Sequence, residues 1–359
     1  MRVARVQLQK GCITTQDVLG LTDYPIIKKN TTLTDELIAI LETFLVQEVE
    51  IEPFLANGKK FTPMAVNEIK DRSNKSETNE KEFIIEYLET VKAYKKLFLS
   101  WQAGLKVEMY DIRKIFVPLF NSAIKHSYVL PKLHHYSNKE DYLYHHCVYV
   151  GILAAVVGKN LHLDQREWLQ IGFGGALADA GMARVAPTIT KKAGALTAAE
   201  FEDVKKHPIY SYKMLMEVTG VSDITRLIVL QHHERYDGSG YPFTIGSKKI
   251  HLFSQIVAVA DVYHAMTSER YYRIKRSPFQ VLEDLSRQQF GKFDVRVIEA
   301  LLQTLIRLSN GDRVRLTSGE EAEIMFVGPH NRTKPIIKIK PGGKIIDLNL
   351  TKLHIEEIL

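Results

Sequence analysis

Apolar residues recur at helical spacing through most of the chain, and this pattern predicts a mainly α-helical protein. Near the N-terminus they fall three or four residues apart over 33–49, behind polar residues placed to cap a helix. Two long amphipathic patterns follow over 82–105 and 109–126, and helical patterns then dominate from 141 to 308.

Strand-like alternation is confined to the two ends of the chain. Polar and apolar residues alternate over 2–9, and alternation returns beyond Gly311 in short runs that glycines separate. We therefore expect a small N-terminal α+β unit over 1–56 and a small C-terminal β-barrel over 310–359.

The middle of the chain divides into a linker, a helix pair and a larger helical domain. The stretch 57–81 is largely polar, which is typical of a mobile linker. The two amphipathic patterns behind it predict either an antiparallel helix pair or a dimer seam, so a homodimer stays open. The four predicted parts are 1–56, 57–127, 128–309 and 310–359.

The composition of the chain gives its net charge and indicates the cellular compartment in which it works. The chain has 359 residues and a formal net charge of +6, which suits an anionic substrate. Cys12 and Cys147 alone provide no disulfide framework, and the longest uncharged apolar run, 147–158, is shorter than the ~20 residues of a membrane span. With no signal-peptide core at the N-terminus, we expect a cytoplasmic protein without a membrane segment.

The basic residues of the last segment are interpreted as solvated charge on the barrel rather than as a nucleic-acid surface. They are Arg313, Arg315, Arg332, Lys334, Lys338, Lys340 and Lys344.

The strongest sign of chemistry is a pair of histidines followed by a turn-rich loop. His232 and His233 end an apolar helical pattern, and Gly238, Gly240 and Pro242 follow them. Imidazole is a common ligand of transition metals. A single histidine at a helix end is more often a capping or surface residue, so the pair alone leaves both interpretations open.

Four more polar side chains lie where a metal would explain them. His207 precedes a proline at the end of a helical pattern, and His146, Asp179 and Asp261 each lie in an otherwise apolar run. A carboxylate in a buried helix is costly unless it is paired or bound to metal. Each residue alone is typical of a satisfied core position, but together they indicate a metal centre built from several helices.

These motifs, in this order and spacing, resemble the HD-GYP branch of the HD-type metal phosphohydrolases. The resemblance covers about half of the chain and is carried by four segments, 191–208, 232–242, 259–263 and 267–273. It implies a helical HD-type domain that hydrolyses cyclic di-GMP or a related cyclic dinucleotide with two or three metals, often iron or manganese.

The resemblance also implies roles for single residues. The first metal would be held by Asp179, His207, His232 and His233. The second would be held by His146, Asp179 and Asp261, with Asp179 bridging, so Asp179 and Asp261 are the expected catalytic carboxylates.

Further positions match parts of the family pattern that meet the substrate. Arg270 and Arg273 match positions that contact substrate phosphates, a task that suits the bidentate geometry of arginine. Tyr241 and Pro242 belong to the loop that names the family, which implies contact with substrate or docking of a diguanylate cyclase domain or another signalling protein.

The chain departs from the family at the histidine–aspartate pair itself. Ala178 stands where the family has histidine, and Met182 where it has lysine. We therefore expect one strong and one weak metal site, and assign Arg184, two residues further on, to the substrate in place of the lysine.

Three other positions differ more mildly. His264 replaces an aspartate, and the sequence assigns it no role. Tyr142 replaces the glutamate that binds a third metal in some members, so a trinuclear site is not expected. His145, adjacent to His146, could serve as a spare ligand, but we interpret it as an outward-facing histidine.

Two classes of function remain open. The retained ligands favour a phosphodiesterase of weak or altered activity on a cyclic dinucleotide. The losses at Ala178 and Met182 favour a catalytically silent module that senses a nucleotide or docks a signalling partner. A third possibility is a structural role in signalling, in which the N-terminal unit and the C-terminal barrel are docking modules.

Overall fold

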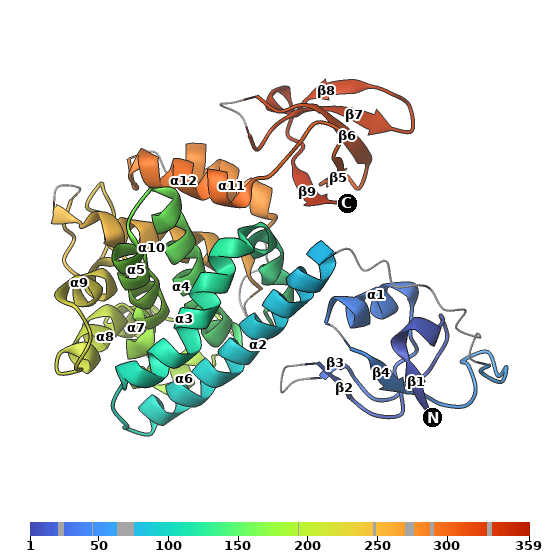
Figure 1. Ribbon diagram of the computed structural model, residues 1–359, viewed down its shortest axis with the longest axis horizontal. Coiled ribbons are helices and arrows are strands. Elements are labelled where there is room, and N and C mark those ends of the chain that lie inside the picture. The colour runs from blue at the N-terminus through green and yellow to red at the C-terminus, as the bar shows by residue number, and fades with distance from the viewer. Residues whose placement is uncertain are drawn as a thin grey trace. The chain divides into compact units, whose positions relative to one another are not determined.

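The structure, a computed structural model, describes residues 1–20, 25–44, 46–62, 75–192, 194–246, 249–269, 276–287, 291–328 and 332–359. These form two compact units, Met1–Lys92 and Ala93–Leu359, whose boundary falls inside helix α2 (Lys75–Gln102). Helices are the dominant element, as the hydrophobic pattern predicted (Figure 1). The finer division into four parts stays a prediction.

The N-terminal unit combines an α-helix with short antiparallel strands. Its elements are β1 (Arg2–Ala4), β2 (Val18–Leu19), β3 (Pro25–Ile27), α1 (Asp35–Thr43) and β4 (Glu48–Glu50). β1 pairs with β4 and β2 with β3, and buried side chains such as Leu33, Leu41 and Ile51 give the unit a core of its own. About half of the predicted linker 57–81, the stretch 63–74, lies outside the described residues. Its last residues, 75–81, belong to helix α2, so the linker prediction is wrong for them.

The second unit is a helical bundle followed by a small sheet. Its longer helices are α3 (Met109–Lys125), α4 (Tyr142–Asn160), α5 (Gln165–Leu177), α8 (His207–Leu215), α9 (Asp223–Gln231), α10 (Leu252–Thr267), α11 (Pro278–Arg287) and α12 (Val295–Leu305). Shorter elements are η2 (Ser127–Tyr136), η3 (Ala180–Arg184), α6 (Pro187–Thr190) and α7 (Ala198–Val204). None of the helices in the described part of the chain is long and apolar enough to cross a membrane.

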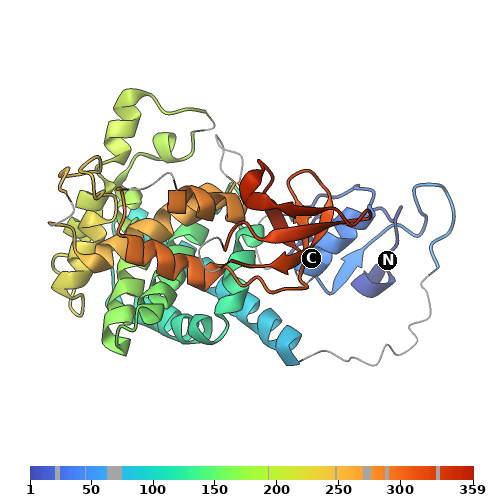
Figure 2. The ribbon, with the colours of Figure 1, turned by 90° about the horizontal axis from the view of Figure 1, so that it is seen from above.

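α4 is the central helix of this bundle. Every residue from His145 to Gly158 is buried, and α3, α5, α10 and α12 all pack against the helix. Figure 1 shows α4 and α5 running side by side, and Figure 2 gives the view from above. A helix that is apolar on all sides belongs inside a bundle, because each of its faces needs an apolar neighbour.

Glycines of α5 bring the neighbouring helices close together. A Cβ atom on Gly174 would lie 2.5 Å from Ile228 of α9, and one on Gly175 would lie 3.1 Å from the carbonyl oxygen of Val150 in α4. Larger side chains would force the three helices apart. The end of α5, where Asp179 follows, is thereby held beside α4 and α9.

The C-terminal strands form an open sheet. They are β5 (Arg313–Leu316), β6 (Glu321–Phe326), β7 (Ile336–Lys340), β8 (Ile345–Asp347) and β9 (Ile355–Ile358), in the order β8-β7-β6-β5-β9 with antiparallel neighbours. The predicted barrel is wrong, because β8 and β9 are edge strands that do not pair within the residues described here. Alternation along a strand predicts the strand, whereas closure depends on hydrogen bonds between the two edges.

A buried group of charges joins α11 to this C-terminal segment. Glu283 forms an ion pair with Lys334 (Oε1–Nζ 3.2 Å), and its Oε2 lies 2.9 Å from Nδ1 of His354. Arg287, one turn further along α11, lies 2.8 Å from the same carboxylate. Lys334 is only 4% exposed, so the interpretation as solvated charge is wrong for this residue. Since a buried charge is destabilising without its partner, the sheet and α11 depend on each other.

Candidate metal centre

Six side chains from five segments of the bundle meet at one place. His146 lies on α4, Asp179 just past α5, His207 at the start of α8, His232 and His233 at the end of α9, and Asp261 on α10. Their candidate ligand atoms form two groups, each within 4.8 Å, namely Asp179, His207, His232 and His233, and His146, Asp179 and Asp261. These are the sets that the sequence analysis assigned to two metals. The structure brings the side chains together, and their role as ligands stays a prediction.

In the first group three acceptor atoms face one another. Oδ1 of Asp179 lies 3.0 Å from Nε2 of His207 and 3.5 Å from Nε2 of His232, and the two Nε2 atoms are 3.2 Å apart. Behind them, Nδ1 of His207 donates to the carbonyl of Val204 and Nδ1 of His232 to that of Val229, both at 2.7 Å. In its neutral form each imidazole has only that one proton, and its Nε2 atom then presents a lone pair.

This arrangement fits a cation. Oδ1 of Asp179 is buried and accepts no hydrogen bond from any described residue, and lone pairs held this close repel unless positive charge lies between them. Metal–ligand bonds of about 2.0–2.2 Å would place neighbouring ligand atoms about 3.0–3.5 Å apart, which is the spacing of this group. An imidazole whose far N–H binds a backbone carbonyl is also the usual form of a metal ligand.

Asp179 presents its other oxygen to the second group. Oδ2 lies 3.5 Å from Nε2 of His146, and that nitrogen is 2.9 Å from Oδ1 of Asp261. Oδ2 of Asp261 is in turn 3.7 Å from Nδ1 of His233. A carboxylate with one oxygen toward each group has the geometry of a ligand that bridges two metals.

The electrostatics of the centre favour the protonation states of metal ligands. Burial would raise the pKa of Asp179, but the neighbouring histidines, His207 foremost, hold that pKa well below its usual value. Burial likewise opposes ionisation of Asp261, while His233 lowers the pKa of that carboxyl. Burial also lowers the pKa of His233 well below its usual range. Both carboxylates therefore need positive charge beside them to stay ionised, and a metal ion would supply that charge while the His233 ring stays neutral.

A close approach between η3 and α8 fixes Asp179 against His207. The backbone N–H of Gly181 donates to Oγ of Ser211 at 2.6 Å, and that hydroxyl donates to the carbonyl of Ala178 at 2.7 Å. A Cβ atom on Gly181 would lie only 2.2 Å from the carbonyl oxygen of His207. Glycine is therefore required here, where the chain carrying Asp179 meets the start of α8.

The loop after His233 is organised by a buried carboxylate that the sequence analysis did not single out. Glu234 accepts hydrogen bonds from the backbone N–H groups of Phe243 at 2.7 Å and Ile245 at 3.1 Å. It is 2% exposed. The available signal was an acid placed directly between two histidines and a turn-rich loop, where it can bind the loop's own backbone.

Tyr241 is thereby placed over the centre. Its ring centroid lies 4.6 Å from that of His233 and 6.3 Å from that of His207. Burial raises the pKa of its hydroxyl, which therefore stays protonated. Pro242 follows it in the same half-buried loop. The predicted contact of both residues with substrate stays a prediction.

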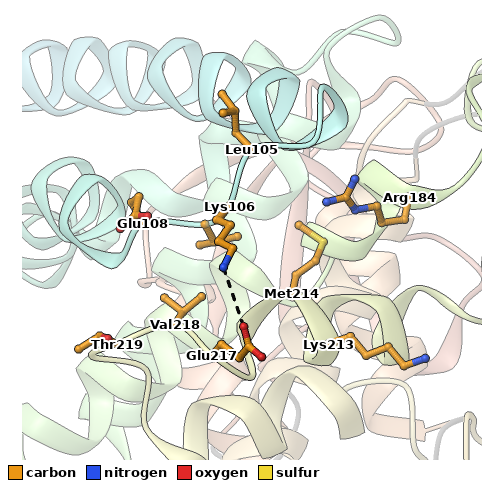
Figure 3. A pocket seen from close by; sticks show the side chains of 10 residues that line it. Leu105, Lys106, Glu108, Arg184, Lys213, Met214, Glu217, Val218 and Thr219 are labelled. Atoms are coloured by element: carbon orange, nitrogen blue, oxygen red, sulfur yellow. Dashed lines mark ion pairs between the residues drawn. The ribbon is translucent and has the colours of Figure 1, made fainter.

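Of the three predicted arginines, only Arg184 belongs to the described residues. Arg270 and Arg273 fall outside the described residues. Arg184 lines a cavity of about 400 Å³ together with Leu105, Lys106, Lys213, Met214 and Glu217, among others (Figure 3). The lining of this cavity includes none of the six side chains of the metal centre. The assignment of Arg184 to the substrate stays a prediction.

Two residues that the sequence analysis did not assign to the centre, Tyr142 and His264, contact His146 of the second group. Nδ1 of His264 lies 2.9 Å from Nδ1 of His146, and the hydroxyl of Tyr142 lies 3.1 Å from the same nitrogen. For His264 the signal was its spacing of three residues from Asp261, which places both on one face of a helix.

The prediction for His145 is wrong. The side chain is fully buried in α4, and burial, followed by the nearby Lys95, lowers its pKa to about 3. Because α4 is enclosed on every side, no outward face was available to it.

The sequence of this chain is similar to those of known proteins, which identify a family for the helical domain. Residues 129–297 match the family of HD domains. A cyclic di-GMP phosphodiesterase of Pseudomonas aeruginosa is 31% identical over 243 residues, which are 68% of this chain and 58% of that protein. The cyclic di-GMP phosphodiesterase response regulator RpfG of Xanthomonas campestris is 36% identical over 152 residues, 42% of this chain and 40% of that one.

A third relative extends the range of substrates named. A 3'3'-cGAMP-specific phosphodiesterase of Vibrio cholerae is 31% identical over 128 residues, 35% of this chain and 24% of that protein. This chain spans about half the length of the curated relatives it matches.

Proposed function

Residues 129–297 are an HD domain of the HD-GYP type, and from this premise we propose that the protein is a metal-dependent phosphodiesterase of a cyclic dinucleotide. The observation that carries the proposal is the position of Asp179, which turns one oxygen to each of two groups of ligand atoms. The names of the relatives, for cyclic di-GMP and for cGAMP, support a cyclic dinucleotide as the substrate class.

The six side chains divide between two ions. Asp179, His207, His232 and His233 would hold one divalent transition metal, iron or manganese, and His146, Asp179 and Asp261 a second. When bound, such ions supply an activated water and neutralise charge on the phosphodiester. The catalytic carboxylates in this scheme are Asp179 and Asp261, whose lowered pKa values keep them ionised.

Other residues of the chain would receive the substrate. Tyr241 offers a protonated hydroxyl beside His233, where it can donate a hydrogen bond to a phosphate or a base. Pro242 shapes the same loop. Arg184, Arg270 and Arg273 are the cations assigned to the substrate phosphates.

Two departures from the family lead us to propose weak or altered activity. Ala178, buried beside Asp179, has no atom that can bind a metal, and Met182 carries no charge toward a phosphate. The second group therefore has one ligand fewer than the first. The same departures favour the alternative of a catalytically silent module that senses a nucleotide or docks a signalling partner, such as a diguanylate cyclase domain.

The experiment that separates the two functions measures metal content and turnover together. The purified chain is stripped of metal, reloaded with Mn²⁺ or Fe²⁺, and incubated with cyclic di-GMP and with 3'3'-cGAMP while the linear products are quantified. We expect both bound metal and turnover. We also expect His233→Ala to lower turnover by more than about 100-fold, since even residues that merely support a ligand are worth about 10–100-fold.

Exposed His135 provides the matched control. His135→Ala removes the same kind of side chain at a position that belongs to neither ligand group, and it should leave turnover unchanged. Bound metal without turnover of either dinucleotide would favour the silent module. Turnover that survives His233→Ala would contradict the proposed centre.

A further inference from the structure

His264 contacts a proposed metal ligand from the side opposite the metal centre. Its Nδ1 lies 2.9 Å from Nδ1 of His146, and its Nε2 lies 3.2 Å from Oγ of Ser268. Asp261, three residues earlier on α10, meets the other nitrogen of the same ring, Nε2, at 2.9 Å. One face of α10 thus holds both nitrogens of His146.

Two neutral rings can share this contact in only two ways. A neutral imidazole carries one proton, so one Nδ1 must donate and the other must accept. If His264 donates, the proton of His146 sits on Nε2 and blocks the atom that faces Asp179 and Asp261. If His146 donates, its Nε2 keeps a lone pair toward them. The proton of His264 then lies on its own Nε2, where Oγ of Ser268 can accept it.

The surroundings of His264 hold its ring in this position. It is fully buried, and the ring of Tyr149 lies 4.5 Å away between centroids. His264 is also no substitute for the histidine missing at Ala178, because it belongs to neither ligand group and meets His146 at the nitrogen turned away from them. Its contribution is therefore made through His146.

We propose that His264 is a positioning residue for His146, which accepts the Nδ1–H of that ring and so leaves Nε2 free for the second metal. The inference deepens the proposed function and rests on the ligand role given there to His146. Carboxylates and carbonyls usually accept this bond behind a metal-bound histidine, and here a second imidazole takes that place.

The test compares His264→Leu with His264→Asp in the full chain. Metal-free protein is titrated with Zn²⁺ by calorimetry, and the imidazole ¹⁵N shifts of the zinc-loaded protein show which nitrogen of His146 carries the proton. We expect His264→Leu to weaken binding of the second ion by about 10–100-fold and to leave the first unchanged. His264→Asp, which keeps an acceptor, should restore both the affinity and the Nδ1–H signal.

A smaller change guards against a variant that fails to fold. Ser268→Ala removes only the acceptor for Nε2 of His264, and we expect it to weaken the second ion several-fold in a folded protein. Unchanged affinity in Ser268→Ala and in a folded His264→Leu, or a His264→Asp as weak as His264→Leu, would overturn this inference alone. A parent chain that binds a single zinc ion would overturn the ligand role of His146, and the inference with it.

Discussion

The Nε2 atoms of His207 and His232 lie 3.2 Å apart, while each ring gives its Nδ1 proton to a backbone carbonyl behind it. A neutral ring therefore has no proton left to donate to the other ring or to Oδ1 of Asp179 beside them. The bundle holds three acceptors together, at an electrostatic cost that a cation would remove. The folded chain should for this reason be more stable with metal than without it.

Removal of metal should therefore lower the melting temperature. A ligand present at a hundredfold excess over its Kd stabilises the folded state by about 2.7 kcal/mol. Calorimetric scans before chelation, after chelation and after metal is restored would measure the effect. Asp179→Asn serves as the control, since Asp179 belongs to both groups and the variant should melt at the same temperature with and without metal. Identical scans of the parent chain would contradict the prediction.

Gly181→Ala should disturb the centre from outside it. The added methyl group would lie 2.2 Å from the carbonyl oxygen of His207 and 2.4 Å from the backbone nitrogen of Ser211, so α8 must move. We expect a loss of about 1–3 kcal/mol in the free energy of unfolding, and weaker metal binding, because His207 moves with the helix. Gly194→Ala is the matched control, since no atom lies within 4 Å of its added methyl group. Equal stability of the two variants would count against this account.

Buried His145 should make stability depend on pH. Its pKa is about 3 in the folded protein and 6.5 in an exposed histidine. Below pH 6.5 the unfolded chain binds a proton that the folded chain does not, so stability falls as the pH drops from 6.5 toward 3 and is level above 6.5. At pH 5 the loss is about 2 kcal/mol.

Urea unfolding of metal-free protein at pH 7 and pH 5 measures this loss. His145→Gln removes the titrating ring, so its stability should fall less between the two pH values, by about 2 kcal/mol. Comparison with the variant cancels the contribution of the other histidines. The same fall in both proteins would show that the His145 ring is not the cause.

Restoring the family residues should raise activity. Ala178→His adds a ligand beside Asp179, and Met182→Lys adds a cation toward the substrate phosphate. We expect fuller occupancy of the second metal and at least about tenfold faster turnover in the double variant, by the magnitude that supporting residues contribute at metal sites. Met182→Gln, which adds polarity without charge, is the control for the lysine. No gain in metal or turnover would argue against the position proposed for the second ion.

Polar residues inside apolar runs were the feature of the sequence that located the centre. Asp179 and Asp261 interrupt helical patterns that are otherwise apolar, and a buried carboxylate needs a partner. That requirement predicted that distant helices would bring their polar residues to one place, and the structure places them so. The mainly helical fold followed from the same periodicity.

The sequence could not show which way some side chains point or whether the C-terminal sheet closes into a barrel. α4 is buried on all faces, so periodicity could not say that His145 points inward as His146 does. Arg184 is only two residues from Met182, but it lies at the end of the short helix η3 and lines a separate cavity. Whether β8 and β9 pair with each other likewise depends on contacts between distant strands, which a local sequence pattern cannot predict.

The segment that is similar to HD domains ends at residue 297, but the packing of the second unit does not. Before its start, the hydroxyl of Tyr94 donates to the carbonyl of Ala176 at 2.8 Å, and beyond its end, Lys334 and His354 contact the carboxylate of Glu283. A chain trimmed to 129–297 would open Ala176 and Glu283 to water and keep only Arg287 beside the carboxylate. The segment 129–297 is thus smaller than the compact unit Ala93–Leu359 to which it belongs. Assays of the trimmed segment would report on an incomplete core.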